Sequence, residues 1–242
     1  VALSRFFEER GLSAFFQNYP YWYLGSTPYR YLTGPIIPLL EVGAHKILPS
    51  VSLFDITIYL VLLSFLLAAV GWTILVLRIT NYELSIRNPK YLILYSIYFL
   101  LFLVLPWRYF SALALSEAST VIAKNLLPFV LLAFWNVLDM YKRANKAFAV
   151  IAGALLLLIN TSVFSILLVG SAGLVLAKSF RKGKFKGVIA NSKRIILITI
   201  YYLLITTLWY TPGYWIPVLT NPSIGGASGI KVFLRIIDLL QA

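Results

Sequence analysis

The chain has 242 residues, of which 60% are hydrophobic and 12% charged, and its mean hydropathy of +0.86 excludes an ordinary water-soluble domain, in which about a quarter of the residues are charged. With no cysteine and a single histidine, His45, the sequence excludes disulfides, Cys-ligated metal and haem bound between two of its own histidines. The net charge of +13 does not indicate a nucleic-acid partner, because the Lys and Arg residues lie between apolar runs, and the composition predicts an all-α polytopic membrane protein.

The predicted external segment at the start of the chain, residues 1–54, contains two short helices. Residues 1–16 carry apolar side chains on one helical stripe, and a short apolar helix is predicted at about 39–48. Between them, residues 18–35 are rich in Pro, Gly and aromatic residues, which indicates ordered turns at the depth of a membrane interface. We expect amphipathic juxtamembrane helices in this loop.

The predicted transmembrane domain, residues 55–211, is a helical bundle. A bilayer core about 30 Å thick needs roughly 20 apolar helical residues. The apolar runs predict six spans, at 56–77, 91–106, 121–140, 147–159, 162–176 and 195–210. Read as one helix, residues 147–177 would extend about 46 Å and carry polar Asn160, Thr161 and Ser162 at the middle, so a hairpin is predicted there.

The basic residues predict the orientation of these spans. Short cytoplasmic loops collect Lys and Arg, and with six spans 13 of the 21 basic residues fall on one side of the membrane. This predicts a multi-pass protein of the cell membrane with both chain ends on the extracytoplasmic side. An outward N-terminus leads us to expect a further helix upstream of Val1. Residues 212–242 are predicted as an external C-terminal segment with an amphipathic helix at 230–240.

The order of these features is similar to that of a known family. An amphipathic helix, then Asn18-Tyr-Pro-Tyr-Trp-Tyr-Leu-Gly-Ser-Thr-Pro28, a second short helix and a span resembles the first external loop of type C (GT-C) membrane glycosyltransferases. The likeness is greatest to archaeal and bacterial membrane proteins of the 6-pyruvoyl-tetrahydropterin synthase-related kind. It extends to Asn125-Leu-Leu-Pro128 in a later span and to the hairpin at Asn160.

The resemblance implies transfer of a sugar from a polyprenyl-phosphate donor at the outer membrane face. In the family an acidic residue of the first external loop acts as base or metal ligand, and it generally lies before the first amphipathic helix, a position that would precede Val1. The expected partners are membrane lipids and a polyprenyl-phosphate-linked sugar. The acceptor is left open, and so is the cofactor, for which a divalent metal is one option.

Candidate site residues must face outward if this chemistry takes place. Glu117, in an external loop, is the candidate catalytic carboxylate, and the alternative is a solvated residue that caps the following span. Arg30, Arg108 and Lys124 are candidates to bind the donor's lipid phosphate. Arg108 equally suits snorkelling to lipid headgroups, whereas Lys124 lies about one turn inside a span, where a cation is costly unless it faces a cavity.

Aromatic and acidic residues give weaker signals. Trp22 and Tyr23 are candidates to stack on a sugar or on the lipid, although interfacial anchoring also explains aromatic residues at this depth. His45 follows Glu41 by four residues, so the pair would share a helix face, as a metal pair, a proton relay or simply a polar surface. Asp139 precedes Lys142 and Arg143, which favours a structural ion pair.

Two other classes of protein remain alternatives to a glycosyltransferase. A transporter or lipid flippase would also have broken helices and intramembrane charge. A non-catalytic scaffold subunit would present the aromatic segment at 19–31 to a partner.

Overall fold

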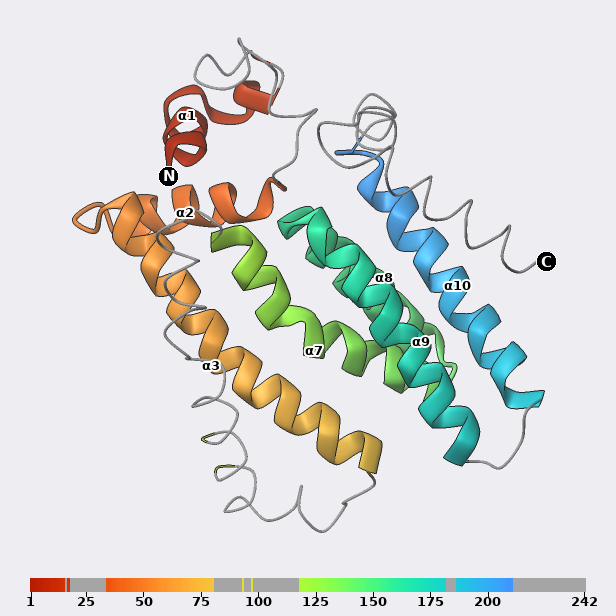
Figure 1. Ribbon diagram of the computed structural model, residues 1–242. Helices are drawn as coiled ribbons and strands as arrows, with labels where there is room; N and C mark the ends of the chain where they lie inside the picture. Colours follow the sequence, from red (N-terminus) through yellow and green to blue (C-terminus); the bar gives the residue numbers. More distant parts are fainter. Residues whose placement is uncertain are drawn as a thin grey trace, which may run out of the picture.

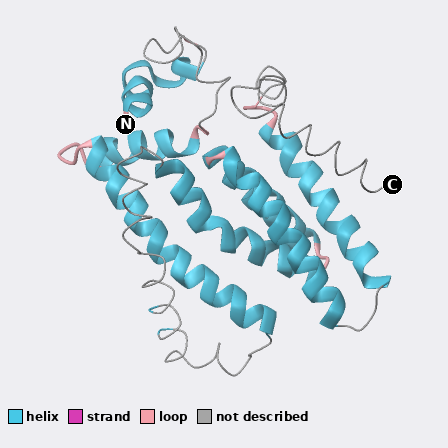
Figure 2. Ribbon diagram, viewed as in Figure 1, coloured by secondary structure: helices cyan, strands magenta, loops and turns pink. Residues whose placement is uncertain are grey.

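The computed structural model describes residues 1–15, 17, 34–80, 93, 97, 118–181 and 186–210, and its regular secondary structure in these ranges is helical (Figure 2). The helices, in chain order, are α1 (Ala2–Arg10), the 3₁₀ helix η1 (Gly11–Phe15), α2 (Ile36–Ile47), α3 (Leu53–Thr80), α7 (Ala118–Asp139), α8 (Arg143–Ile159), the 3₁₀ helix η3 (Thr161–Val163), α9 (Phe164–Arg181) and α10 (Lys186–Thr206). The all-α prediction is therefore confirmed for the described part of the chain.

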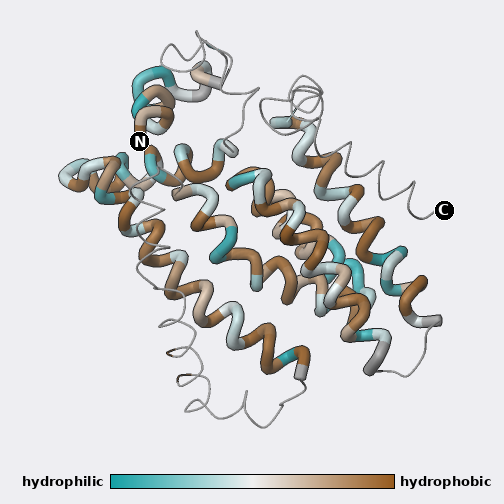
Figure 3. Tube along the Cα trace, viewed as in Figure 1, coloured by the Kyte–Doolittle hydropathy of each residue, from teal (hydrophilic) through white to brown (hydrophobic). Residues whose placement is uncertain are grey.

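Four of the described helices are long and apolar enough to cross a membrane, at Leu53–Ile79, Ala118–Asp139, Thr161–Ser179 and Gly187–Thr206 (Figure 3). Helix α8 has 17 residues, which corresponds to about 26 Å and is shorter than a bilayer core of about 30 Å. Apart from residues 93 and 97, the predicted span at 91–106 lies outside the described residues, and so does the predicted C-terminal segment at 212–242. The count of six spans therefore stays a prediction, although the membrane class is supported.

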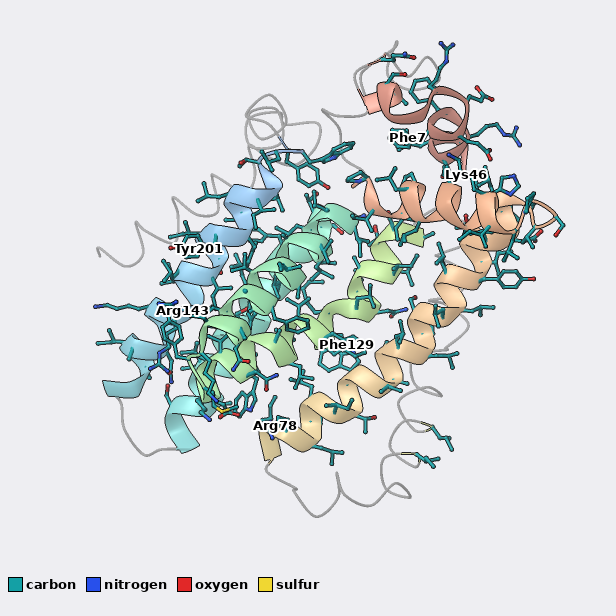
Figure 4. The ribbon with its side chains drawn as sticks, turned by 180° about the vertical axis from the view of Figure 1, so that it is seen from behind. Phe7, Lys46, Arg78, Phe129, Arg143 and Tyr201 are labelled. Atoms are coloured by element: carbon teal, nitrogen blue, oxygen red, sulfur yellow. The ribbon has the colours of Figure 1, made fainter. Side chains whose placement is uncertain are left out.

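Helix α7 lies at the centre of the bundle. In its most apolar window 72% of the residues are buried, against 17% in α10 at the edge. Helix α3 packs along one side of α7, while α8 and α9 pack against it elsewhere and α10 covers both of them (Figure 1). The α3 contact is close because Gly71 leaves room for the ring of Phe129, which Figure 4 shows between α7 and α3. A Cβ at Gly71 would lie 2.9 Å from that ring.

Contacts between side chains fix the directions of these helices. Helices α3 and α7 are parallel, because Ser64 contacts Asn125 and, later along both helices, Arg78 contacts Asp139. Helix α8 is antiparallel to α7, since its early residue Asn145 bonds to the Asn136 carbonyl. If the chain crosses the membrane once between α3 and α7, as predicted for residues 91–106, then α3 and α7 must be parallel, and they are.

The predicted break at Asn160 is confirmed. Helix α8 ends at Ile159, and Asn160 has the extended backbone angles φ −162° and ψ 127°. Its side-chain oxygen accepts from the Ser162 amide at 2.8 Å, which caps η3, and its amide nitrogen donates to Thr120 Oγ1 at 2.8 Å. The asparagine therefore ends one helix, starts the next and fixes the turn to α7.

The helices extend further into the basic segments than the predicted spans do. Helix α10 begins at Lys186 instead of residue 195, and α9 continues to Arg181 instead of ending at residue 176. The spans were delimited by apolar residues, but backbone hydrogen bonding in a helix does not require them. Long cationic side chains can extend from an apolar helix end towards polar surroundings.

Helices α1 and α2 lie across the opposite end of the bundle, which we call the α2 end (Figure 1). Figure 4 shows Phe7 and Lys46 at this end and Arg78 at the other, which we call the basic end. A second apolar cluster joins α1 and α2 to the end of α10, through the buried residues Phe6, Phe7, Ala14, Val42, Trp209 and Tyr210. Helices were predicted at both positions, while their relation to a membrane surface stays a prediction.

Candidate functional site

Lys124 is the predicted site residue that falls within the described part of the chain. The other predicted site residues lie outside it, namely Trp22, Tyr23, Arg30, Arg108 and Glu117. A site that combines them is therefore still a prediction. The geometry around Lys124 can be built directly.

The Lys124 side chain is exposed on a helix that is otherwise buried or half-buried along its whole length. It lies six residues after the start of α7 at Ala118, which corresponds to about 9 Å along the helix. It makes no hydrogen bond or ion pair with the described residues. An ionised side chain at this depth of an apolar helix is costly and is typical of a functional position.

The backbone at the same position is also unusual. Helix α7 contains Pro128, four residues after Lys124. Because proline has no N–H, the carbonyl of Lys124 lacks the amide donor that an α-helix normally supplies to it. Position 124 therefore combines a charged side chain with a freed backbone acceptor, on the central helix of the bundle.

Polar side chains surround this position at the α2 end of the bundle. One turn before Lys124, Thr120 accepts from Asn160 Nδ2, and the same nitrogen lies 3.2 Å from Ser119 Oγ. Next to Lys124, the buried Asn125 donates to Ser64 Oγ of α3 at 3.0 Å. We call these six residues, Ser64, Ser119, Thr120, Lys124, Asn125 and Asn160, the polar layer. Its hydrogen bonds join α3, α7 and the α8–α9 turn, and Lys124 is its exposed, charged member.

Sequence reasoning identified part of this layer. Asn125 and Asn160 belong to the motifs that carried the family resemblance, but Ser64 was missed. Its signal was present, since Ser64 is the one polar residue in the run from Leu60 to Val70. A lone serine in an apolar span often bonds across to a neighbouring helix.

A buried carboxylate lies where α1, α2 and α3 meet. Glu41 is 2% exposed and accepts hydrogen bonds from Ser4 Oγ and from Thr57 Oγ1, the latter at 2.6 Å. His45 takes different partners, Glu8 at 3.5 Å and the Val51 carbonyl at 2.8 Å. The expectation of a polar surface shared by Glu41 and His45 is therefore wrong. Both side chains connect α2 to α1, but Glu41 does so through Ser4 and His45 through Glu8.

A metal site also lacks support in the described residues. No group of three or more His, Asp or Glu side chains comes together there with the arrangement that could hold a metal ion. Glu8 and Glu41 each have a separate partner, as described above.

The basic end contains a cluster around Asp139. Lys178 of α9 donates to Asp139 Oδ1, and Arg78 Nε of α3 lies 3.9 Å from Asp139 Oδ2. The Lys178 side chain is 8% exposed, and its Nζ lies 4.9 Å from the ring centre of Trp135. The expected ion pair of Asp139 thus forms with two other helices and not with Lys142 or Arg143, which follow it in sequence.

The apolar helices and their packing define the class of this molecule as an α-helical membrane protein. Comparisons of the chain with protein-family models, with curated proteins and with solved structures found no match. The functional argument therefore depends on the residues of the site themselves.

Proposed function

We propose that this protein is a membrane glycosyltransferase of the type C kind, or a part of one, in which Lys124 binds the phosphate of a polyprenyl-phosphate-linked sugar. The observation that carries the proposal is the exposed Lys124 inside an apolar central helix, with no ion-pair partner among the described residues. The resemblance of the 18–28 segment to that family supplies the reaction, transfer of the sugar at the outer membrane face.

The physical argument concerns the cost of the cation. A lysine at the centre of a span costs roughly 2.5 to 3.5 kcal/mol, less near the membrane interface. A lipid phosphate offers a partner of opposite charge near this depth, because its isoprenoid chain remains in the bilayer while its headgroup meets the polar layer. Lys124 would supply the charge, and the Thr120 hydroxyl, one helical turn before it, accepts from Asn160 and still has its own proton to donate to a sugar or phosphate oxygen.

The orientation in the proposal follows from charge. If the basic end faces the cytoplasm, as the positive-inside tendency favours, then Lys124 and the α2 end face outward. Helices α1 and α2 then flank the segment that carries Trp22, Tyr23 and Arg30. These residues, with Glu117 as base, complete the proposed site.

The test uses the chain reconstituted in liposomes with a photoactivatable polyprenyl-phosphate sugar. We expect Lys124→Ala to lower photolabelling by at least about tenfold, since charge-assisted hydrogen bonds contribute about 1.5 to 3 kcal/mol. Lys124→Arg should retain most of the labelling because it keeps the charge. The matched control is Lys46→Ala, which removes an exposed lysine on α2 and should change nothing. Equal labelling of wild type and Lys124→Ala would overturn the assignment of Lys124.

A transfer assay separates the reaction from binding. Radiolabelled sugar is followed from the polyprenyl phosphate into lipid and protein acceptors of a membrane extract, with Glu117→Ala as the second variant. Loss of transfer with retained photolabelling in Glu117→Ala is the expected result. Photolabelling without any transfer by the wild type would overturn the glycosyltransferase assignment.

A transporter of the same lipid is the second candidate, and Pro128 is the observation that favours it. A freed carbonyl beside a cation within a span also occurs where helices break around a transported substrate. Movement of a fluorescent polyprenyl-phosphate sugar between leaflets, measured by quenching from one side, distinguishes this candidate. Protein-dependent movement without transfer would favour it.

A further inference from the structure

A cluster of cations surrounds Tyr141 at the basic end, outside the site proposed above. Tyr141 lies in the connection between α7 and α8, and the residue is 38% exposed. Lys146 Nζ of α8 lies 4.5 Å from the ring centre and the Arg194 guanidinium carbon of α10 lies 4.9 Å from it. Two helices that are about 50 residues apart in sequence thus bring their cations to one ring.

Three more cations, Lys142, Arg143 and Lys193, are exposed beside these residues in sequence. We call the six residues, Tyr141, Lys142, Arg143, Lys146, Lys193 and Arg194, the Tyr141 cluster. None of its cations has an ion-pair partner among the described residues. Asp139 is the nearest acidic residue in sequence, but its carboxylate is already engaged by Lys178 and Arg78.

This arrangement is unfavourable without an anion. Lys146 and Arg194 both lie within 5 Å of one ring centre, so their separation falls within the roughly 10 Å over which charges interact at 0.1 M salt. The first turn of α8 contains two of the cations and no acidic residue, although the helix dipole favours negative charge at that end. The Tyr141 ring offsets only a small part of this repulsion, because the attraction between a cation and an aromatic ring is weak at exposed sites.

The surroundings of the cluster identify the anion's source. Directly beyond Lys146 on α8, Phe148 and Ile151 are 61% and 54% exposed, and beyond Arg194 on α10, Ile196 is 57% exposed. The cations therefore lie where an apolar surface of the bundle ends. A lipid fits both parts, because its acyl chains can lie along the apolar surface while its phosphate reaches the cations.

We propose that the Tyr141 cluster is a binding site for the phosphate of an anionic membrane lipid in the leaflet at the basic end. Arg194 holds the phosphate through its planar fork and Lys146 adds a point charge, with Tyr141 keeping both side chains in position. The remaining exposed cations raise the local lipid concentration. This site is independent of Lys124 and of the proposed glycosyltransferase activity.

The test measures thermal stabilisation of the purified chain in a neutral detergent by short-chain phosphatidylglycerol. A ligand that binds the native state raises the melting temperature in a concentration-dependent manner. We expect wild type to be stabilised by phosphatidylglycerol and not by phosphatidylcholine of the same chain length. Lys146→Ala with Arg194→Ala should raise the lipid concentration needed for half of the effect by at least about tenfold.

The matched control removes two exposed arginines of α1, Arg5→Ala with Arg10→Ala, which changes the net charge equally at the α2 end and should leave the response unchanged. Tyr141→Phe, which keeps the ring, should respond as wild type does, and Tyr141→Leu should respond more weakly. An unchanged response in the Lys146 and Arg194 double variant would overturn the site. Equal stabilisation by inorganic phosphate would overturn its assignment to a lipid.

Discussion

At the scale of single residues, two glycines near α2 differ in the space around them, and this difference predicts their tolerance to change. A Cβ on Gly34 would lie 1.6 Å from the Leu158 carbonyl oxygen at the end of α8, whereas a Cβ on Gly43 within α2 would meet nothing within 4 Å. We expect Gly34→Ala to lower the melting temperature of the detergent-solubilised protein, because backbone has to move. Gly43→Ala should be neutral or stabilising, by up to about 1 kcal/mol of helix propensity.

A melting temperature of Gly34→Ala equal to that of wild type would contradict the close approach of residue 34 to the α8 end. The Gly43 variant controls for the change of residue type alone. Gly34 lies just before α2, so the comparison also tests whether the chain entering α2 is held against the bundle.

The sequence could not predict which side chains of different helices bond to each other. Asn160 could be identified, since three polar residues interrupt one long apolar run and a turn there shortens an implausible helix. Glu41 could not, because its partners Ser4 and Thr57 belong to other helices and no local pattern joins them. Periodicity reports which face of one helix is apolar, and it does not report which helix packs there.

At the scale of helices, Asp139 is the ionic link between α3, α7 and α9. Removing one partner of a buried ion pair leaves a charge without compensation, which costs about 3 to 5 kcal/mol in soluble proteins. We expect Asp139→Asn to lower the melting temperature, because the buried Lys178 loses its carboxylate partner. The double variant Asp139→Asn with Lys178→Met should regain much of the loss, since no buried cation remains.

The control for this pair is Asp55→Asn at the start of α3. Asp55 is exposed and pairs only locally with Ser52, at 2.6 Å, so its substitution should change the melting temperature little. If the double variant is no more stable than Asp139→Asn, the ion pair does not act as a unit and the clusters at this end require another explanation.

The centres and the ends of the helices differ in how well the sequence predicts them. The apolar centres of α3, α7, α8, α9 and α10 could all be predicted, since hydropathy decides which segments enter a membrane. The points at which these helices begin or end in basic segments could not be predicted from hydropathy. Residues such as Lys186, Lys193 and Arg194 form the backbone hydrogen bonds of α10 as readily as apolar residues do. A helix can therefore be longer than its apolar span. Lys146 of α8 and Arg194 of α10 lie in such basic helical segments, and both contact the Tyr141 ring.

At the scale of the whole molecule, the two ends of the bundle differ in chemistry. The α2 end is closed by apolar and hydrogen-bonded contacts among α1, α2 and the segment that follows α10, with Glu41 accepting hydrogen bonds from two hydroxyl groups. The basic end gathers described Lys and Arg residues from α3, α8, α9, α10 and the connection between α7 and α8. This asymmetry is the signal on which the predicted orientation depends, and it also divides the two proposed sites, with Lys124 towards one end and the Tyr141 cluster at the other.

The orientation can be measured directly because the chain has no cysteine, so a single introduced cysteine reports one position without a background. Lys46 on α2 is exposed at the α2 end (Figure 4), and Lys142 is exposed three residues after Asp139, whose partner Arg78 lies at the basic end. In intact cells we expect Lys46→Cys to react with a membrane-impermeant maleimide and Lys142→Cys to react only after permeabilisation, since the positive-inside tendency directs basic connections to the cytoplasm. Labelling yield on a gel is the measurement. The reverse pattern would put Lys124 and its polar layer in the cytoplasmic half, where an outer-face sugar transfer has no access to them, whereas the Tyr141 site would then face the outer leaflet and still bind its lipid.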